Sequence, residues 1–269
     1  MKWGVCCSSR ALGEVSALVA AVAEAGFDYI ELGAAEVREE RAFETLRAQL
    51  AGAALQPEAW NSFVPAEHRI TGPDVNMSAL LDYCETTLQR CAALGGRVMV
   101  LGSGGARRVA EGFDPAEAHQ QFVAFCRELA PLAQNAGMVV CIEPLNRRED
   151  NLINSLAAGA AVVEAVNHPA LQLLADLYHM TEDGEPTSEV ARYAPHLRHT
   201  HGADLGRVVP GFAPEGEGDF VGFLGALHQA GYQGRFSFEG RWDDLPAQLR
   251  PLLAFLRQRW NEVALPKTP

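Results

Sequence analysis

Residues 138–147 read MVVCIEPLNR, a short apolar run that ends in a carboxylate, Glu143, followed by a proline. Three further short runs along the chain also end in a charged or imidazole side chain: LQLLAD at 171–176, LRHTH at 197–201 and FSFE at 236–239. Each run has the length of a β-strand and ends in a side chain that is costly to bury without a partner. Four such endings in succession predict that Glu143, Asp176, His201 and Glu239 share a cation at one rim of a barrel.

Apolar strand patterns alternate with amphipathic helical patterns along the whole chain. Eight strands are expected, at Trp3–Cys7, Tyr29–Leu32, Gln56–Asn61, Arg97–Leu101, Met138–Ile142, Leu171–Ala175, Leu197–Thr200 and Phe236–Phe238. Apolar residues with helical spacing predict the intervening helices, at Val15–Ala25, Ala42–Leu50, Met77–Leu94, Pro115–Ala136, Ser155–Val166, Thr187–Tyr193, Phe220–Ala230 and Leu245–Trp260.

Strict β-then-α alternation indicates parallel strands joined by crossover helices. Eight such units in 269 residues fit an α/β fold of the (β/α)₈ TIM-barrel type, with a doubly wound open sheet as the main alternative. We expect a single barrel domain over residues 1–269, because no linker rich in Pro, Ser or charge divides the chain.

The four candidate ligands are separated by 33, 25 and 38 residues, which is near one β/α unit each time. Reactive residues of (β/α)₈ barrels lie at the carboxyl-terminal rim and come from different strands. We therefore expect the four side chains to be neighbours around that rim.

Composition limits the classes of partner. The chain has 34 acidic and 22 basic residues and a formal net charge of −12, which disfavours nucleic acid and anionic membrane surfaces. No apolar run approaches the roughly 20 residues of a membrane span, and the N-terminus lacks the apolar stretch of a secretory signal. The six cysteines form no C-x-x-C pair and are interpreted as reduced. These features predict a cytoplasmic protein.

Three carboxylates and one imidazole, with no thiolate, suit a divalent ion that accepts oxygen ligands. Mn²⁺, Mg²⁺ and Co²⁺ fit this set, and Zn²⁺ is compatible with it. Four protein ligands on a six-coordinate ion would leave room for a hydroxyl–carbonyl pair of a sugar. The ion would act as a Lewis acid, and Glu143 and Glu239 could then remove and return a proton from opposite faces of the substrate.

The local motifs resemble those of the sugar isomerase/epimerase superfamily that is built on the xylose-isomerase-like barrel. The first motif is IEPLNR at 142–147 with Glu149 shortly after, and the second is DLYHM at 176–180. HTH at 199–201, followed by Arg207, is similar to the third, and FEG at 238–240 to the fourth. The motifs occur in family order across nearly the whole chain. The pattern is closest to ketose 3-epimerases and hydroxypyruvate-isomerase-like enzymes.

The resemblance implies a metal-dependent sugar isomerase or epimerase that interconverts small ketoses or related hydroxy-carbonyl sugars through an enediolate. It implies that one divalent metal is bound by Glu143, Asp176, His201 and Glu239. Glu143 and Glu239 would also form the acid/base pair, and substrate oxygens would be held by Glu149, His179 and Arg207. The expected partner is a small sugar or sugar phosphate, and the chain is compatible with a homo-oligomer.

Residues near other strand ends give further expectations. Trp60, Asn61 and Phe63, at the end of the third strand, could form an apolar wall against a sugar ring. His199 should share a strand face with His201, as a ligand or as a partner of the ligand. Glu31 would contact the substrate, support a ligand or serve a structural role.

The glycine-rich stretch GSGGARR at 102–108 invites a dinucleotide-binding interpretation, but Arg107 stands where that fingerprint needs glycine. The stretch also follows the fourth strand, whereas the fingerprint belongs to the first β/α unit. We expect a rim loop that admits substrate, with Arg107 or Arg108 in contact with a phosphate.

Three alternatives to the isomerase remain open. A lyase resembling inosose dehydratase would begin with the same proton abstraction and end with loss of water. A hydrolase resembling apurinic endonucleases would share the barrel. That resemblance would imply a three-zinc site with more histidines and a basic DNA-binding face. A sugar-binding protein without catalytic activity would bind its ligand and exchange no proton.

Overall fold

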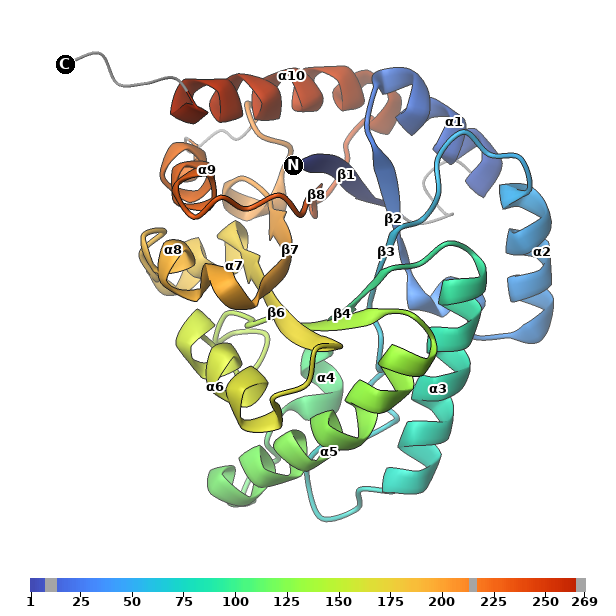
Figure 1. Ribbon diagram of the computed structural model, residues 1–269, viewed down its shortest axis with the longest axis vertical. Coiled ribbons are helices and arrows are strands. Elements are labelled where there is room, and N and C mark those ends of the chain that lie inside the picture. Colours follow the sequence, from blue (N-terminus) through green and yellow to red (C-terminus); the bar gives the residue numbers. More distant parts are fainter. Residues whose placement is uncertain (8–13, 213–216, 265–269) are drawn as a thin grey trace.

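The computed structural model describes residues 1–7, 14–212 and 217–264 of the chain. Eight parallel strands close into a barrel in sequence order, with the last strand paired to the first (Figure 1). The strands are β1 (Lys2–Cys7), β2 (Tyr29–Gly33), β3 (Ala59–Asn61), β4 (Val98–Leu101), β5 (Val139–Ile142), β6 (Leu171–Asp176), β7 (Leu197–Gly202) and β8 (Arg235–Phe238). The predicted (β/α)₈ barrel is therefore confirmed, and the open doubly wound sheet is excluded.

Helices form a ring around the strands (Figure 1). The longer ones are α1 (Val15–Ala25), α2 (Glu40–Leu50), α3 (Met77–Ala93), α5 (Pro115–Asn135), α6 (Leu156–Val166), α9 (Phe220–Gln229) and α10 (Leu245–Ala264). Short helices lie in the connections between the strands: η2 (Ala34–Val37), α4 (Gly104–Arg107), α7 (Leu177–Asp183), α8 (Glu189–Tyr193), η3 (Ala194–His196) and η4 (Leu205–Arg207). The predicted elements are all present, with shifted ends. For example, β3 begins at Ala59 and not at Gln56, because Pro57 has no N–H to give to the ladder.

Strand alternation divides the core into two clusters. The smaller one lies inside the barrel and consists of Tyr29, Ala59, Val98, Val100, Cys141 and Leu174. The larger one packs the other faces of the strands against the helices. Gly4 of β1 makes room for the interior ring of Tyr29, because a Cβ atom at this position would collide with that ring. The filled interior leaves the rim as the place for a site.

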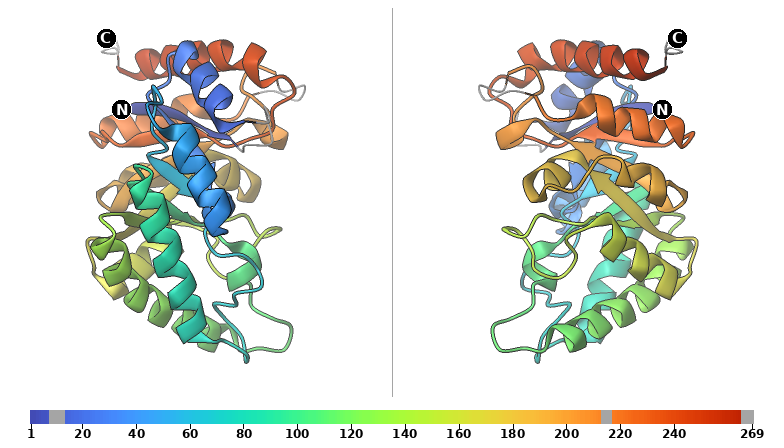
Figure 2. Two further views of the ribbon diagram at one scale, coloured as in Figure 1. Left: turned by 90° about the vertical axis from the view of Figure 1, so that its right-hand side faces the viewer. Right: turned by 90° about the vertical axis from the view of Figure 1, so that its left-hand side faces the viewer.

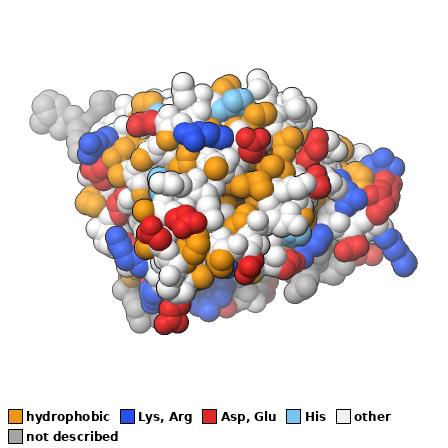
Figure 3. All heavy atoms as spheres, turned by 90° about the horizontal axis from the view of Figure 1, so that it is seen from below, with side chains coloured by type: hydrophobic (Ala, Val, Ile, Leu, Met, Phe, Trp, Pro, Cys, Tyr) orange, Lys and Arg blue, Asp and Glu red, His pale blue; other side chains and the backbone are white. Residues whose placement is uncertain are grey.

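The carboxyl ends of all eight parallel strands meet at one rim, and the candidate residues lie at these strand ends or in the segments that follow them. The long connections that follow β3 and β4 project at the lower end of the molecule in side view (Figure 2). On the face seen in Figure 3, basic side chains are scattered among acidic ones and do not gather into a patch. Among the described helices, none combines the length and the apolar character needed to cross a bilayer.

Candidate active site

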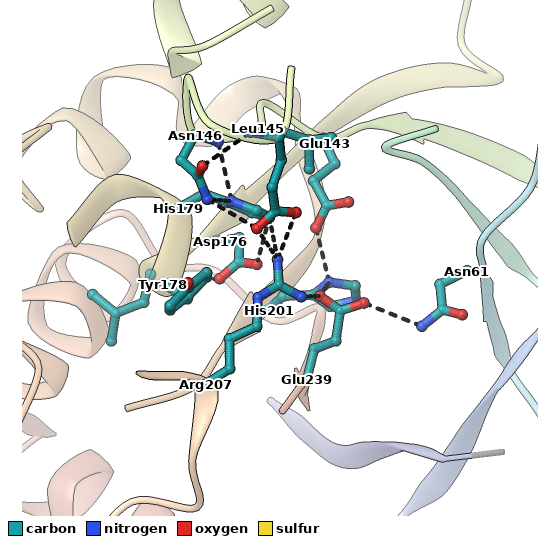
Figure 4. A network of polar contacts seen from close by, with 12 residues as sticks. Asn61, Glu143, Leu145, Asn146, Asp176, Tyr178, His179, His201, Arg207 and Glu239 are labelled. Carbon is teal, nitrogen blue, oxygen red and sulfur yellow. Dashed lines mark hydrogen bonds and ion pairs between the residues drawn. The ribbon is translucent and has the colours of Figure 1, made fainter. Parts of the chain in front are cut away.

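The four candidate ligands meet at the carboxyl-terminal rim of the barrel, as expected (Figure 4). One oxygen or nitrogen atom from each of Glu143, Asp176, His201 and Glu239 lies within 4.8 Å of the others. Asp176 and His201 are paired in register across β6 and β7, and both are buried. Glu143 and Glu239 directly follow β5 and β8, and the side chain of Glu239 is the most open of the four, at 22% exposed.

Backbone hydrogen bonds hold the two glutamates in place beyond their strands. The N–H of Glu143 donates to the carbonyl of Leu101 (3.2 Å), and the N–H of Glu239 donates to the carbonyl of Gly202 (3.2 Å). Gly102 also matters here, because a Cβ atom at this position would collide with the carboxylate of Glu143. The chain thus needs glycine next to the end of β4 so that Glu143 can turn toward the rim.

The imidazole of His201 presents one nitrogen to the cluster and the other to the barrel interior. Its Nδ1 lies 3.1 Å from Glu143 Oε1 and 3.6 Å from Glu239 Oε2. Its Nε2 lies 3.0 Å from Oε1 of Glu31 on β2. Nδ1 is therefore the nitrogen that is available to an ion bound among the four side chains.

Glu31 and His199 lie beneath the cluster and outside the cleft. Glu31 is completely buried, and its Oε2 lies 2.7 Å from Nε2 of His199. Burial opposes the charged form of Glu31, but His201 and His199 outweigh this effect and hold its pKa well below the usual value. Of the roles left open above, the geometry makes Glu31 a partner of His201 and excludes contact with a ligand in the cleft. His199 is not among the atoms that meet at the rim.

The cluster without a cation carries an excess of negative charge. Burial, followed by repulsion from Glu143 and Glu239, raises the pKa of Asp176 to about 8. Burial and the Glu239 carboxylate also raise the pKa of Glu143. Burial opposes the imidazolium form of His201, but Glu31 outweighs it and raises its pKa. Without a cation these side chains therefore take up protons more readily than usual. A dication would supply the missing positive charge, so the donor set fits a divalent ion that prefers oxygen.

A second polar group lies beside the first. His179 is on α7, one helical turn after Asp176, and its Nε2 lies 3.6 Å from Asp176 Oδ2. Its Nδ1 accepts the backbone N–H of Asn146 (3.1 Å). Burial, followed by the charge of Arg207, lowers the pKa of His179 to about 3, so the ring is neutral and carries its hydrogen on Nε2.

Arg207 completes this second group (Figure 4). Its Nη2 donates to both carboxylate oxygens of Glu149 at 3.0 Å, and its guanidinium lies over the ring of Tyr178, 4.5 Å from the centroid. Its Nη1 lies 3.8 Å from Glu239 Oε2. The structure therefore brings Glu149, His179 and Arg207 together next to the four candidate ligands.

The backbone around Arg207 is held in an uncommon conformation. Arg207 has φ of +58°, a left-handed value that is strained for a residue with a side chain. Its N–H donates to the carbonyl of Asp204 (2.9 Å), and its carbonyl accepts the N–H of Arg241 (2.6 Å). These contacts fix the loop so that the guanidinium points into the site.

Five of these side chains, those of Glu143, Glu149, His179, Arg207 and Glu239, line a cleft of about 360 Å³, within the usual size of small-molecule sites. Asn61, Ser62 and Ser103 line it as well, from the ends of β3 and β4. Nδ2 of Asn61 donates to Oε1 of Glu239 (3.3 Å). Of the four non-glycine residues with positive φ in the described part of the chain, three line this cleft: Ser62, Ser103 and Arg207.

Trp60 does not reach the cleft. Its side chain is completely buried in the cluster between the strands and the helices. Successive side chains of β3 alternate, so Ala59 and Asn61 face inward and Trp60 faces outward. Phe63 is also completely buried in that cluster. Of the three residues expected to form an apolar wall, only the polar Asn61 lines the cleft, so the wall is absent.

The expectation that Arg107 contacts a phosphate is wrong. Arg107 is completely buried, and its Nε donates to Asp150 Oδ2 at 2.6 Å. Its Nη1 donates to the carbonyl of Leu101 (3.0 Å) and its Nη2 to that of Glu143 (2.9 Å). Arg108 is exposed and donates to the carbonyl of Arg148 (2.9 Å). Arg107 therefore ties the ends of β4 and β5 together.

Comparisons with known proteins agree with this architecture. Residues 19–259 match the family model described as xylose isomerase-like TIM barrel. The chain belongs to the xylose isomerase-like TIM barrel family, which confirms the predicted resemblance.

Several individual relatives are epimerases by name. The chain is 30% identical over 142 residues to an L-ribulose 3-epimerase of Methylomonas sp., a match that covers 52% of this chain and 49% of that protein. It is 34% identical over 134 residues to the 3-dehydro-D-guloside 4-epimerase of Escherichia coli, with 49% and 50% covered. The chain thus spans about half the length of the curated relatives it matches. The crystal structure of a 3-keto-D-glucoside 4-epimerase from E. coli, at 26% identity, superposes with a TM-score of 0.81 over 96% of this chain and 99% of that one.

Proposed function

We propose that the chain is a divalent-metal-dependent sugar epimerase or isomerase that acts on a small, uncharged keto sugar. The observation that carries the proposal is the placement of two acid/base candidates, Glu143 and Glu239, in one small cleft with a set of hydrogen-bond donors. The names of two relatives, which specify L-ribulose and a 3-dehydro-D-guloside, support the same class of substrate.

The metal would be held by Nδ1 of His201 and by the carboxylates of Glu143, Asp176 and Glu239. Mn²⁺, Mg²⁺ or Co²⁺ suits this set best, and Zn²⁺ is compatible with it. When bound, the ion would polarise the substrate carbonyl and so make the neighbouring C–H more acidic.

Glu143 and Glu239 would exchange the proton at that carbon. One carboxylate removes it, and the other returns a proton to the opposite face, which inverts the stereocentre. The amide of Asn61, which donates to Glu239 Oε1 at 3.3 Å, keeps that carboxyl group turned into the cleft. Return of the proton to the adjacent carbon would give aldose–ketose isomerisation instead.

His179 and Arg207 would bind a substrate oxygen between them. His179 carries its hydrogen on Nε2, and Nη2 of Arg207 lies only 3.1 Å from that nitrogen. Two donors that face each other cannot bond, so an oxygen with lone pairs is the group that both can share. Glu149, which pairs with Arg207, is placed to accept a neighbouring hydroxyl hydrogen.

Charge favours an uncharged sugar over a sugar phosphate or an anionic keto acid. Four carboxylates, those of Glu143, Glu149, Asp176 and Glu239, outnumber the positive charges of Arg207 and one dication. Arg38 also lines the cleft, but it is paired with Glu67 at 3.2 Å. An anionic substrate would therefore meet net repulsion near the reacting carbon.

Deuterium uptake from solvent tests the proposal. The Mn²⁺-loaded protein is incubated in D₂O with ketoses and 3-keto-glycosides, and NMR locates the label. Label at an inverted carbon beside the carbonyl indicates epimerisation, and label at C1 or C2 indicates aldose–ketose isomerisation. Glu143→Gln and Glu239→Gln should each reduce exchange by at least about 100-fold. Glu58→Gln, at the opposite end of the barrel, is the matched control and should exchange normally.

Other outcomes separate the alternatives. Loss of water with an enone or dione chromophore would identify the lyase, and tight binding without exchange would identify a sugar-binding protein. Hydroxypyruvate in the panel tests the charge argument, because exchange with this anion at a rate above that of every neutral sugar would contradict it. Cleavage of abasic DNA would identify the hydrolase.

A further inference from the structure

Glu31 is a buried carboxylate that the proposed reaction does not use. It lies in the middle of β2 and is completely shielded from solvent. A buried carboxylate is strongly destabilising unless hydrogen bonds compensate for its lost hydration. The contacts that compensate Glu31 indicate what it is for.

Three side chains from two other strands surround Glu31. Its Oε1 accepts from Nε2 of His201 at 3.0 Å, and its Oε2 lies 2.7 Å from Nε2 of His199, both on β7. Oγ of Ser237 on β8 donates to the same Oε2 at 2.7 Å and is within 2.7 Å of the hydroxyl of Tyr29. Because a carboxylate only accepts, both imidazoles present an N–H to it.

We propose that Glu31 is a positioning residue for the metal site: it holds His201 with hydrogen on Nε2 and thereby aims the Nδ1 lone pair at the ion. The direct contact is to His201, whose Nδ1 faces Glu143 at 3.1 Å on the other side of the ring. An acceptor on the remote nitrogen fixes the tautomer and ring orientation of a metal-binding histidine and makes it a stronger ligand. Ser237 and Tyr29 in turn hold the carboxylate of Glu31.

His199 has a different role from His201 in this network. Its Nε2 donates to Glu31, and its Nδ1 has no hydrogen-bond partner among the described residues. The two rings are 4.8 Å apart and nearly perpendicular, at 80°. His199 therefore stabilises the negative charge of Glu31 by donating a hydrogen bond to it. Of the two histidines, only His201 connects Glu31 to the proposed metal ligands at the rim.

Metal affinity and the state of the His201 ring test this inference. Kd for Mn²⁺ is measured by competition with a chelator for the wild type, Glu31→Gln and Glu58→Gln. Glu58→Gln is the matched control, because it also removes a strand-associated carboxylate, at the opposite end of the barrel. In parallel, ¹⁵N-histidine NMR of the Mg²⁺-loaded protein reports which nitrogen of His201 carries hydrogen.

The wild type should show a slowly exchanging Nε2–H on His201. Glu31→Gln should weaken or remove this signal and raise Kd by about 10–100-fold, while Glu58→Gln leaves Kd unchanged. A merely structural role for Glu31 would lower thermal stability without changing Kd or the histidine signal, and this result would overturn the inference. If Glu31→Gln does not fold, Glu31→Asp retracts the carboxylate by one methylene. It should raise Kd by about tenfold, and an unchanged Kd would again overturn the inference.

The inference rests on the proposed metal site, but the two fail in different ways. If the wild-type protein binds no divalent metal, the proposed metal site itself is contradicted. If the wild type binds Mn²⁺ tightly and Glu31→Gln binds it with equal affinity, only the proposed role of Glu31 is contradicted.

Discussion

Gly102 and the carboxylate of Glu143 are so close that even one methyl group between them would produce a collision. Gly102 directly follows β4, and Glu143 directly follows the neighbouring β5. The side chain that is absent at one strand end thus decides where the carboxylate of the next strand end lies.

Gly102→Ala should therefore displace Glu143 and reduce activity. A misplacement of about 1 Å in a reacting group can cost about 100-fold in rate, so we expect kcat to fall by about that factor. The measurement is the rate of deuterium exchange with the best substrate. Gly225→Ala, where an added Cβ would make an ordinary contact with Val263, is the control. Equal activity of both variants would contradict the packing argument.

Arg107 should be essential for stability and not for substrate binding. Removal of its side chain leaves the buried carboxylate of Asp150 without a positive partner and, among the described residues, with only the backbone N–H of Ile153 as a donor, at a cost of about 3–5 kcal/mol. Arg107→Ala should lower the urea midpoint accordingly. The double variant Arg107→Met/Asp150→Leu should recover a large part of this loss, because it removes both charges. A double variant as unstable as Arg107→Ala would show that the ion pair is not the cause.

Arg207→Lys should impair substrate recognition although it keeps the charge. A lysine cannot donate to Glu149 and reach a substrate oxygen with one planar group. Loss of one hydrogen bond to a charged group, about 1.5–3 kcal/mol, predicts a decrease in kcat/KM of about 10- to 150-fold. Steady-state kinetics measure it, and Arg38→Lys, at the paired arginine of the cleft, should change little. If the Arg207→Lys variant kept the wild-type kcat/KM, the proposed role of Arg207 in substrate binding would be wrong.

The ion-pair group at the opposite end of the barrel makes stability depend on acid pH. Glu58 lies 2.7 Å from Lys2 Nζ, and its Oε2 accepts Nε of Arg235 at 2.8 Å. Burial alone would raise the pKa of Glu58, but these cations outweigh it and lower the pKa below 4.5. The stabilisation is therefore fully present above about pH 4.5 and is lost as the pH falls through the lowered pKa. The difference in unfolding free energy between wild type and Glu58→Gln should shrink between pH 6 and pH 3, and a constant difference would exclude the mechanism.

The sequence alone was sufficient to predict the barrel and the grouping of the four rim residues, and the reason is physical. Glu143, Asp176, His201 and Glu239 each come at the end of a predicted strand, and successive β/α units place consecutive strand ends side by side at one rim. Closure of β8 onto β1 adds no further requirement for these four, because they lie on neighbouring strands.

Contacts across the barrel could not be read from the sequence in the same way. Glu31 is on β2 and His201 is on β7, and they meet only because the interior of a closed barrel brings distant strands together. The role of Glu31 therefore stayed open until the fold was known. The expectation for Arg107 failed because its glycine-rich surroundings indicate a loop at the surface, and nothing in them shows that the arginine is buried and paired with Asp150, which follows the next strand. Trp60 was misplaced by one step of strand alternation.

Anomalous diffraction from crystals grown with Mn²⁺ tests the central claim most directly. We expect one strong peak per chain, in contact with Glu143, Asp176, Glu239 and Nδ1 of His201. A peak elsewhere in the molecule, or saturating Mn²⁺ with no peak between these four side chains, would contradict it.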